Sequence, residues 1–135
     1  MADDDADDFS LVKDIVDTSL ENVQLNWIRD GIQLMDYLYR RGKFEAAQRP
    51  DLILLDINMP LKNGREVLME LKSNPYFRRI PILILSTSSD PMNILDCYLS
   101  GASSYLVKPS MYKSLHRAIT VSVDYWTRTV TLPAG

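Results

Sequence analysis

Two short, uninterrupted apolar runs constrain the fold of this 135-residue chain more than any other feature. Residues 52–55 and 82–85 are introduced by Pro50 and Pro81, and they end in the polar residues Asp56 and Ser86. Apolar runs without polar alternation are typical of parallel strands that are covered on both faces. We therefore expect an α/β fold in which helices connect the strands of a parallel sheet.

Helical patterns separate these runs. Apolar residues recur at helical spacing from Phe9 to Leu20, and residues 32–39 and 66–71 form two further amphipathic segments. Asp90 and Pro91 predict the start of a helix that ends near Gly101. Weaker strand patterns lie at residues 23–28 and 104–107.

The last helix is expected to start at Ser110 as its N-cap. Its predicted apolar stripe consists of Met111, Leu115, Ala118, Ile119, Ser122 and Trp126. Residues 127–135 are expected to extend the chain beyond this helix. No linker rich in Gly or Ser divides residues 1–135, so we predict a single domain.

The composition indicates the cellular compartment and excludes some classes of binding partner. Cys97 is the only cysteine, the N-terminus is acidic, and no apolar run approaches the roughly 20 residues that span a bilayer. The net charge of -3 gives no reason to expect a nucleic acid or an anionic membrane as a partner. These features predict a cytoplasmic protein.

Polar side chains follow the predicted strands at one edge of the sheet. Right-handed crossovers bring the carboxyl ends of parallel strands together, which places Asp56, Ser86 and Lys108 at this edge. Asp3 and Asp4 precede the first helix, so three carboxylates can converge there. Clustered carboxylates repel one another unless a cation neutralises them, and hard oxygen ligands favour Mg²⁺.

The remaining polar groups complement a phosphoryl group. Ser86 offers a hydroxyl and Lys108 a positive charge, which suit the negative charge spread over phosphoryl oxygens. Together with the acidic cluster, they predict a phosphoryl-transfer site in which a carboxylate is the nucleophile.

Four motifs make a family resemblance specific. They are residues 2–8 (ADDDADD), 52–60 (LILLDINMP) followed by Asn63 and Gly64, 80–87 (IPILILST) and 101–109 (GASSYLVKP). In order and spacing they resemble the response-regulator receiver domains, of which the chemotaxis receiver is one, over residues 2 to about 126. Residues 65–68 and the C-terminal tail are similar to stand-alone receivers that serve phytochrome-type and other hybrid histidine kinases. The resemblance implies a three-layer, flavodoxin-like, doubly wound parallel sheet.

The resemblance also implies a metal site and a phosphorylation site. Asp56 would be the phospho-acceptor and would bind Mg²⁺, with Mn²⁺ as an alternative. Asp4 would be a direct ligand, Asp3 a ligand through water, and the backbone carbonyl of Asn58 a further ligand. Asn58 and Ser88 match positions that tune the loss of the phosphoryl group.

The resemblance assigns the remaining site residues to phosphoryl binding and switching. Ser86 would bind a phosphoryl oxygen, and Lys108 would pair with Asp56 or with its phosphoryl group. Tyr105 resembles the switch aromatic that turns inward when Ser86 moves toward the phosphate. Pro109 would follow a cis peptide bond.

The implied function is that of a response regulator in a two-component phosphorelay. A histidine kinase or phosphotransfer protein would supply the phosphoryl group, and the output would be protein docking or onward transfer. A homodimer through the last two helices and the strand between them is a further expectation. Such a protein is not an enzyme beyond catalysing its own phosphorylation and dephosphorylation.

Two other functions remain open. An aspartyl-phosphate phosphatase commonly carries a second Asp two residues after the nucleophile, and Asn58 occupies that position here. A phosphorylation-independent interaction module is the other alternative.

One departure from the family pattern concerns the start of the chain. Receivers normally begin with an apolar central strand, whereas only Met1 and Ala2 precede Asp3. We expect a truncated strand, a sheet rebuilt with four strands, or a strand supplied by another molecule. Residues 127–132 have strand-like composition and are a further candidate for the vacant place. The hypothesis is that this form is destabilised or strand-exchanged and holds Mg²⁺ poorly.

Overall fold

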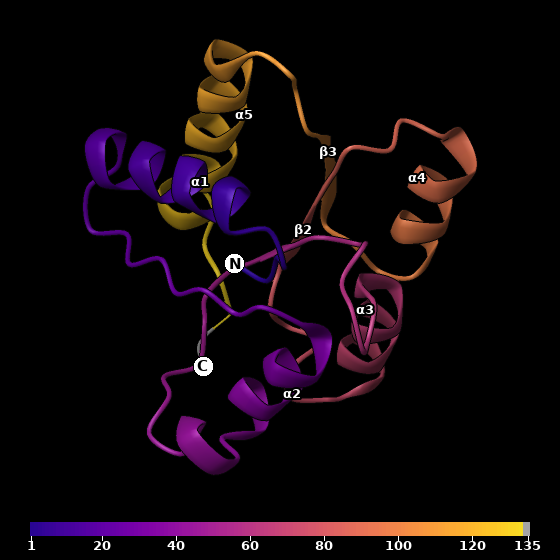
Figure 1. Cartoon of the computed structure of the whole chain (residues 1–135). Helices are drawn as coiled ribbons and strands as arrows, with labels where there is room; N and C mark the ends of the chain where they lie inside the picture. The colour runs from indigo at the N-terminus through magenta and orange to yellow at the C-terminus, as the bar shows by residue number, and fades with distance from the viewer. Residues whose placement is uncertain (134–135) are drawn as a thin grey trace.

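The computed structural model describes residues 1–133, in which helices surround a parallel sheet (Figure 1). In chain order the elements are α1 (Ala6–Ser19), α2 (Gly31–Tyr39), the 3₁₀ helix η1 (Gly42–Phe44), β1 (Ile53–Leu55), α3 (Gly64–Ser73), β2 (Ile82–Ser86), α4 (Pro91–Leu99), β3 (Ser104–Val107), α5 (Tyr112–Asp124) and the π-helical turn η2 (Tyr125–Thr129).

The two apolar runs form the centre of the sheet, as predicted. β1, β2 and β3 are parallel and adjacent in that order, with Ile53 opposite Ile82 and Leu83 opposite Ser104. Every residue of β1 and β2 is buried, as both faces of a doubly wound sheet require. The strand predicted at residues 104–107 is confirmed as β3.

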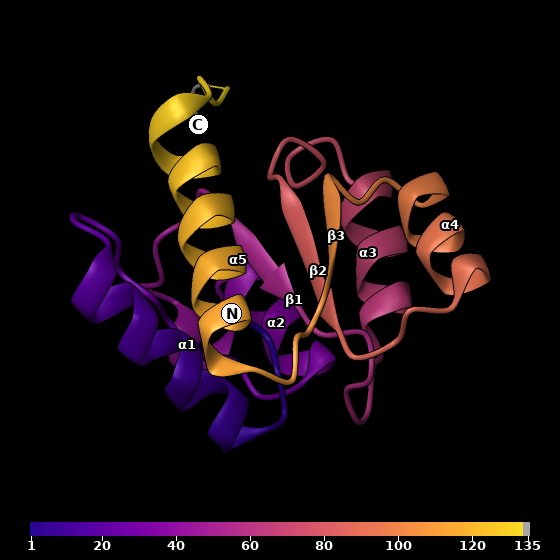
Figure 2. The ribbon, with the colours of Figure 1, turned by 90° about the horizontal axis from the view of Figure 1, so that it is seen from above.

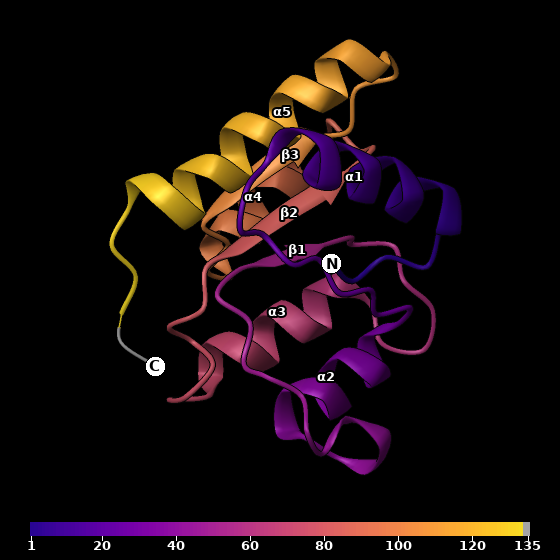
Figure 3. The same cartoon turned by 90° about the vertical axis from the view of Figure 1, so that its left-hand side faces the viewer.

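Residues 1–3 extend the sheet beyond β1. Ala2 lies between Ile28 and Leu55 and is parallel to both. The Ala2 N–H donates to the Leu54 carbonyl at 2.8 Å, and the Asp3 N–H donates to the Ile28 carbonyl at 3.0 Å. Figure 3 shows the N-terminus beside β1.

The N-terminal end therefore holds the place of the expected central strand, but only around Ala2. Within the described residues, the strand predicted at 23–28 is reduced to the single bridge at Ile28, and residues 127–132 do not join the sheet. No four-strand rebuilding is seen in this part of the chain.

Helices cover both faces of the sheet (Figure 2). Side chains of Leu54, Leu83 and Leu85 pack with α1 and α5, whereas Ile53 and Ile82 pack in the core on the side of α2 and α3. The alternation of side chains along each strand divides the apolar residues between these two cores. The three-layer, doubly wound architecture is confirmed.

The last helix begins later than its sequence suggested. Its N-cap is Met111, which is extended and makes no side-chain capping bond, so the prediction of Ser110 as the cap is wrong by one residue. Met111 is 66% exposed and does not belong to the buried stripe, because it precedes the first helical turn. The buried residues of α5 are Leu115, Ile119 and Val123. Residues 134–135 of the predicted C-terminal extension lie outside the described residues.

Candidate functional site

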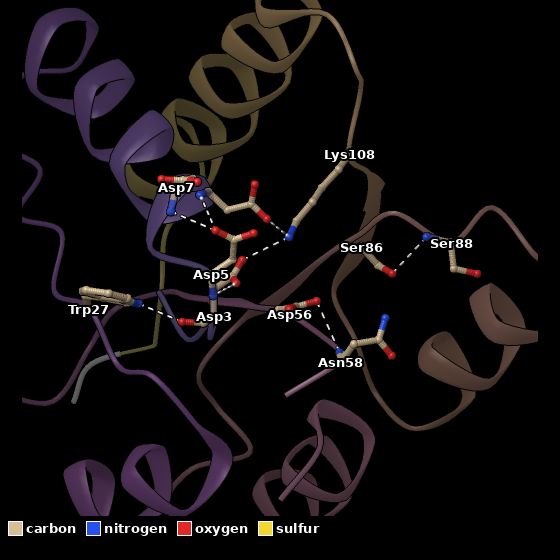
Figure 4. Close-up of polar contacts among 10 residues, drawn as sticks. Asp3, Asp5, Asp7, Trp27, Asp56, Asn58, Ser86, Ser88 and Lys108 are labelled. Carbon is tan, nitrogen blue, oxygen red and sulfur yellow. Dashed lines mark hydrogen bonds and ion pairs between the residues drawn. The ribbon is translucent and has the colours of Figure 1, made fainter. Parts of the chain in front are cut away.

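Three parallel strands deliver polar side chains to one edge of the sheet. Asp56 directly follows β1, Ser86 is the last residue of β2, and Lys108 directly follows β3. Figure 4 shows these side chains facing the same region as Asp3. The predicted convergence is therefore confirmed.

The acidic cluster consists of Asp3, Asp4 and Asp56. One carboxylate oxygen from each lies within 4.8 Å of the others. Asp3 is 1% exposed and Asp56 is 8% exposed, whereas Asp4 is open to solvent. Three hard oxygen donors at this spacing, one of them open to solvent, suit a divalent cation that keeps part of its water shell.

The backbone pairing of residues 1–3 places Asp3 in the cluster. The Asp56 N–H donates to the Ala2 carbonyl at 2.9 Å, so the two acidic segments are tied together one residue before Asp3. Asp3 Oδ1 accepts the Asp5 N–H at 2.9 Å, and Asp5 in turn caps α1. The first helix therefore starts directly after the N-terminal part of the acidic cluster.

Burial sets the protonation of the two enclosed carboxyl groups. It raises the pKa of Asp56 above its ordinary value, an effect that the charge of Lys108 partly opposes and the charge of Asp3 reinforces. Burial likewise raises the pKa of Asp3, while hydrogen bonds from Asp5 and Lys108 lower it. Both groups would gain from a cation that replaces the competing proton.

Lys108 makes a different contact from the one expected. Its Nζ donates to Asp3 Oδ2 at 3.0 Å and to Asp8 Oδ2 at 2.7 Å, and neither of these bonds reaches Asp56. Burial alone would lower the pKa of Lys108, but its bonds to Asp8 and Asp3 raise it above the ordinary value. Pairing with Asp56 itself is thus not observed, and pairing with a phosphoryl group stays a prediction.

Asp8 is a site residue that sequence reasoning missed. The sequence placed it only within the acidic motif of residues 2–8, with no role of its own. It is partly exposed, and α1 places it beside Lys108. A sequence signal existed in its position, because Asp8 lies in the first turn of the helix that directly follows the acidic pair Asp3 and Asp4.

The prediction of a cis peptide bond before Pro109 is wrong. Among residues 1–133 every peptide bond is trans. The trans form is favoured even before proline, and Lys108 reaches Asp3 and Asp8 with this geometry.

The loop after Asp56 is packed against the start of α3. The Asn58 N–H donates to Asp56 Oδ1 at 3.3 Å, and the Gly64 N–H donates to the Ile57 carbonyl at 2.9 Å. A Cβ on Gly64 would collide with the Asp56 carbonyl oxygen. Gly64 therefore supports the loop that follows Asp56, a role that its place in the motif did not indicate. Whether the Asn58 carbonyl binds metal stays a prediction.

Ser86 and Tyr105 are joined through Ser88. Ser86 Oγ is buried and accepts the Ser88 N–H at 3.1 Å. The Tyr105 hydroxyl donates to the Ser88 carbonyl at 2.8 Å. The half-buried Tyr105 ring packs against the core, and the backbone N–H of Tyr105 donates to the Tyr98 hydroxyl. The proposed switch residues are therefore connected, while their movement stays a prediction.

Trp27 is the second residue that sequence reasoning missed. Its ring stacks on Phe9 with centroids 4.8 Å apart, and the Arg29 guanidinium lies over its other face at 4.4 Å. Its indole Nε1–H donates to the Asp3 carbonyl at 2.8 Å. No motif pointed to it, because the contact arises from the pairing of residues 1–3 with residue 28.

Comparison with known proteins identifies the class that this fold and site define. The family model of the response regulator receiver domain matches residues 1–120. The response regulator Rcp1 of Synechocystis sp. is 39% identical over 135 residues, which cover 100% of this chain and 92% of Rcp1. The chain belongs to the response regulator receiver family, whose members act in two-component signalling with histidine kinases or phosphotransfer proteins.

Within this family the chain is similar to regulators that serve phytochromes. The crystal structure of the phosphorylated cyanobacterial phytochrome response regulator RcpA has a TM-score of 0.93 and 37% identity, covering 98% of this chain and 95% of RcpA. The Mn²⁺-bound form of Rcp1 has a TM-score of 0.92 and 39% identity, covering 98% and 96%. RPA3017, from red light signaling in R. palustris, has a TM-score of 0.90 and 31% identity, covering 99% and 96%.

Across residues 1–133, no helix combines the length and the apolar character that a membrane span needs.

Proposed function

We propose that this receiver accepts a phosphoryl group on Asp56 in a reaction that depends on Mg²⁺, with Mn²⁺ as a substitute. The observation that carries the proposal is the acidic cluster of Asp3, Asp4 and Asp56 within 4.8 Å, placed beside Lys108. The Mn²⁺-bound form of Rcp1 supports the choice of cation. The phosphorylated form of RcpA supports the choice of chemistry.

Different residues would bind the metal and take part in phosphoryl transfer. Asp3, Asp4, Asp56 and the Asn58 carbonyl would hold the cation, which neutralises charge on the phosphoryl oxygens. A carboxylate oxygen of Asp56 attacks the phosphorus, and the bond from phosphorus to the donor nitrogen or oxygen breaks. Ser86 and Lys108 then bind phosphoryl oxygens, so Lys108 exchanges a carboxylate partner for the new negative charge.

The proposed donor is a phytochrome-type histidine kinase or a phosphotransfer protein, in the cytoplasm. The chain catalyses only its own phosphorylation and dephosphorylation and is not otherwise an enzyme. We do not propose a nucleic acid or a membrane as its partner. The similarity to RcpA, a phytochrome response regulator, and to RPA3017, from red light signaling, supports a phytochrome-type donor.

The proposed output surface consists of α4, β3 and α5, through which two copies would also pair. Large apolar side chains are exposed on these elements, including Leu99 at 75% and Val121 at 59%. Exposed apolar area of this kind favours protein docking. Tyr105 on β3 connects this surface to Ser86 through Ser88.

Acetyl phosphate with Mg²⁺ tests the proposal directly. Intact-mass measurement should show one added phosphoryl group, and the adduct should be absent in Asp56→Asn and after chelation of the metal. Asp51→Asn is the matched control, since Asp51 is exposed and lies before β1. Adduct formation on Asp56→Asn, or continuous turnover of phosphate esters by the unaltered protein, would overturn the proposal.

A further inference from the structure

Six cationic side chains lie at the end of the sheet opposite Asp56. The parallel strands begin at this end, since residues 49–50 precede β1 and residues 78–81 precede β2. α2 also ends here, because the Tyr39 ring packs against the Phe77 ring with centroids 5.0 Å apart. We refer to the cluster as the basic face, which consists of Arg40, Arg41, Lys43, Arg49, Arg78 and Arg79.

The basic face differs in charge from the rest of the chain. Residues 39–50 and 74–80 contain six Arg or Lys residues and one acidic residue, Glu45. The whole chain carries a net charge of -3, so the remaining residues are acidic overall. The edge with the acidic cluster therefore presents negative charge, and the opposite end of the sheet presents positive charge.

Most of these cations have no partner of opposite charge within the chain. Arg41 pairs with Asp36, but at 3.6 Å and with 60% of the Arg41 side chain exposed. Across residues 1–133, no ion pair is formed by Arg40, Lys43, Arg78 or Arg79. Exposed guanidinium groups without a carboxylate partner are available to an anionic group from outside the chain.

The loop that carries Arg78 and Arg79 is fixed by its contacts. The Lys72 Nζ donates to the Arg78 carbonyl at 3.1 Å from α3. The Arg49 guanidinium donates to the Tyr76 carbonyl at 2.7 Å, which ties the segment before β1 to this loop. The two exposed arginines therefore extend from an ordered backbone, so binding through them costs less conformational entropy.

The end of α2 accounts for only part of the basic face. Arg40 is the C-cap of α2 with a φ of 56°, in the left-handed region that favours glycine. Helix carbonyls at a C-terminus attract positive charge, which suits Arg40 and Arg41. Arg78 and Arg79 have no such explanation, because they precede a buried strand rather than follow a helix end.

Aromatic rings lie among the cations. The Arg41 guanidinium lies over the Tyr39 ring at 4.3 Å, and the Lys43 Nζ lies 5.1 Å from the Phe44 ring centroid. These two rings are thus already in contact with cations, and they offer little free surface for stacking nucleic-acid bases. Tyr76 is 74% exposed and offers apolar area that a side chain of a partner can cover.

We propose that the basic face binds an acidic segment of a partner protein, whose carboxylates pair with Arg40, Arg78 and Arg79 while an apolar side chain covers Tyr76. Five of the six cations are arginines, whose planar guanidinium groups bind carboxylates through two hydrogen bonds. A long run of phosphates fits less well, because the rest of the chain is acidic overall.

The position of the basic face makes this binding independent of phosphorylation. It lies at the ends of the strands where they begin, whereas Asp56 follows the end of β1. The partner can therefore remain bound while Asp56 gains and loses its phosphoryl group. The basic face and the proposed output surface on α4, β3 and α5 would then bind different proteins.

A labelled peptide in which glutamates flank a single leucine is the probe, and a peptide with glutamine at every glutamate is its control. Fluorescence anisotropy measures binding without metal or phosphoryl donor. We expect the glutamate peptide to bind more tightly, and added salt to weaken its binding. Arg78→Glu combined with Arg79→Glu should weaken it roughly tenfold or more.

Two further variants separate binding from folding and from net charge. Lys113→Glu combined with Arg117→Glu makes the same change in net charge at exposed positions of α5, and should leave the affinity unchanged. Arg40→Gly removes a charge together with an unfavourable backbone conformation. It should weaken binding roughly threefold without lowering the melting temperature.

The proposal would be overturned if the glutamate peptide did not bind, if both peptides bound equally, or if the α5 variant lost as much affinity as the variant at Arg78 and Arg79. Tighter binding of single-stranded DNA than of the glutamate peptide would assign the face to a nucleic acid and overturn it as well. Asp56→Asn should not change the affinity, and a change would contradict the independence from phosphorylation. A failure of Asp56 to accept phosphate would leave these measurements valid.

Discussion

The indole of Trp27 holds the backbone of Asp3 through a hydrogen bond of 2.8 Å from Nε1 to the carbonyl oxygen. Phe9 and Arg29 fix the indole plane from its two sides. The backbone of one member of the acidic cluster is therefore held by a side chain some two dozen residues away.

Trp27→Phe should weaken Mg²⁺ binding while preserving most of the fold. The phenyl ring keeps the stacking on Phe9 but loses the N–H that positions Asp3. A lost hydrogen bond of ordinary strength, about 1 kcal/mol, corresponds to roughly a fivefold increase in Kd. Calorimetric titration measures the affinity, and Trp126→Phe is the control. An unchanged Kd would show that Trp27 does not position Asp3.

Lys108→Ala should strengthen metal binding although it removes a proposed phosphoryl contact. Lys108 Nζ occupies Asp3 Oδ2 at 3.0 Å and thus competes with a cation for that carboxylate. We expect Kd for Mg²⁺ to fall roughly three- to tenfold, and the metal-free protein to melt at a lower temperature because buried Asp3 loses its partner. Lys113→Ala, on an exposed position of α5, is the control. Weaker Mg²⁺ binding would contradict the competition.

Asp56→Asn should raise the melting temperature of the metal-free protein at neutral pH. Burial raises the pKa of Asp56 in the folded protein above its ordinary value of 3.8. This carboxyl group therefore favours folding below pH 3.8, and its contribution to stability is lost as the pH rises through the folded-state pKa. Asparagine removes the cost of burying an ionised carboxylate, together with the repulsion from Asp3. Thermal melts between pH 4 and pH 8 should show the advantage of the variant growing with pH. An advantage independent of pH would contradict the assignment to Asp56.

On acidification, Mg²⁺ binding should begin to weaken at a higher pH than it would if the ligands were carboxylates of ordinary pKa. The raised pKa values of Asp3 and Asp56 mean that protons compete with the cation from above 3.8. Titrations at successive pH values should show proton release on binding. Constant affinity down to pH 4 would exclude Asp3 and Asp56 as the ligands that decide the affinity.

Gly64→Ala should destabilise the protein and disturb the Asp56 loop. A Cβ at this position would meet the Asp56 carbonyl oxygen and the Ile57 Cα, both backbone atoms that cannot rotate away. The expected cost is about 1–3 kcal/mol of unfolding free energy, with weaker Mg²⁺ binding. Denaturant unfolding measures it, and Met69→Ala is the control because Met69 is exposed on the same helix. A change below that of the control would show that the loop can move aside.

The sequence predicted the sheet and the acidic cluster because both depend on local patterns. Apolar runs ending in Asp56 and Ser86 identify β1 and β2 without knowledge of their neighbours. The start of α4 at Pro91 likewise follows from a local signal, since Asp90 accepts the Met92 N–H as its cap. Strand ends in a parallel sheet share one edge, so the convergence of Asp56, Ser86 and Lys108 followed from topology alone.

Contacts that depend on tertiary packing were not predictable in the same way. Trp27 reaches Asp3 only because residue 28 pairs beside Ala2. The preference of Lys108 for Asp3 and Asp8 depends on the exact approach of α1 to β3. The predicted strand at 23–28 was wrong for the same reason, because among the described residues of this segment Ile28 alone forms a bridge, to Ala2.

Two hydrogen bonds to Ser88 connect the sheet edge that carries Asp56 and Ser86 with Tyr105 on β3. Ser86 holds the N–H of residue 88, and Tyr105 holds the carbonyl of the same residue. If the Ser86 hydroxyl turned away to meet an incoming anion, the residue whose N–H it released, Ser88, would be the one whose carbonyl accepts the Tyr105 hydroxyl. The change would then pass from Ser86 to Tyr105 through one residue, Ser88, and would require no helix to bend.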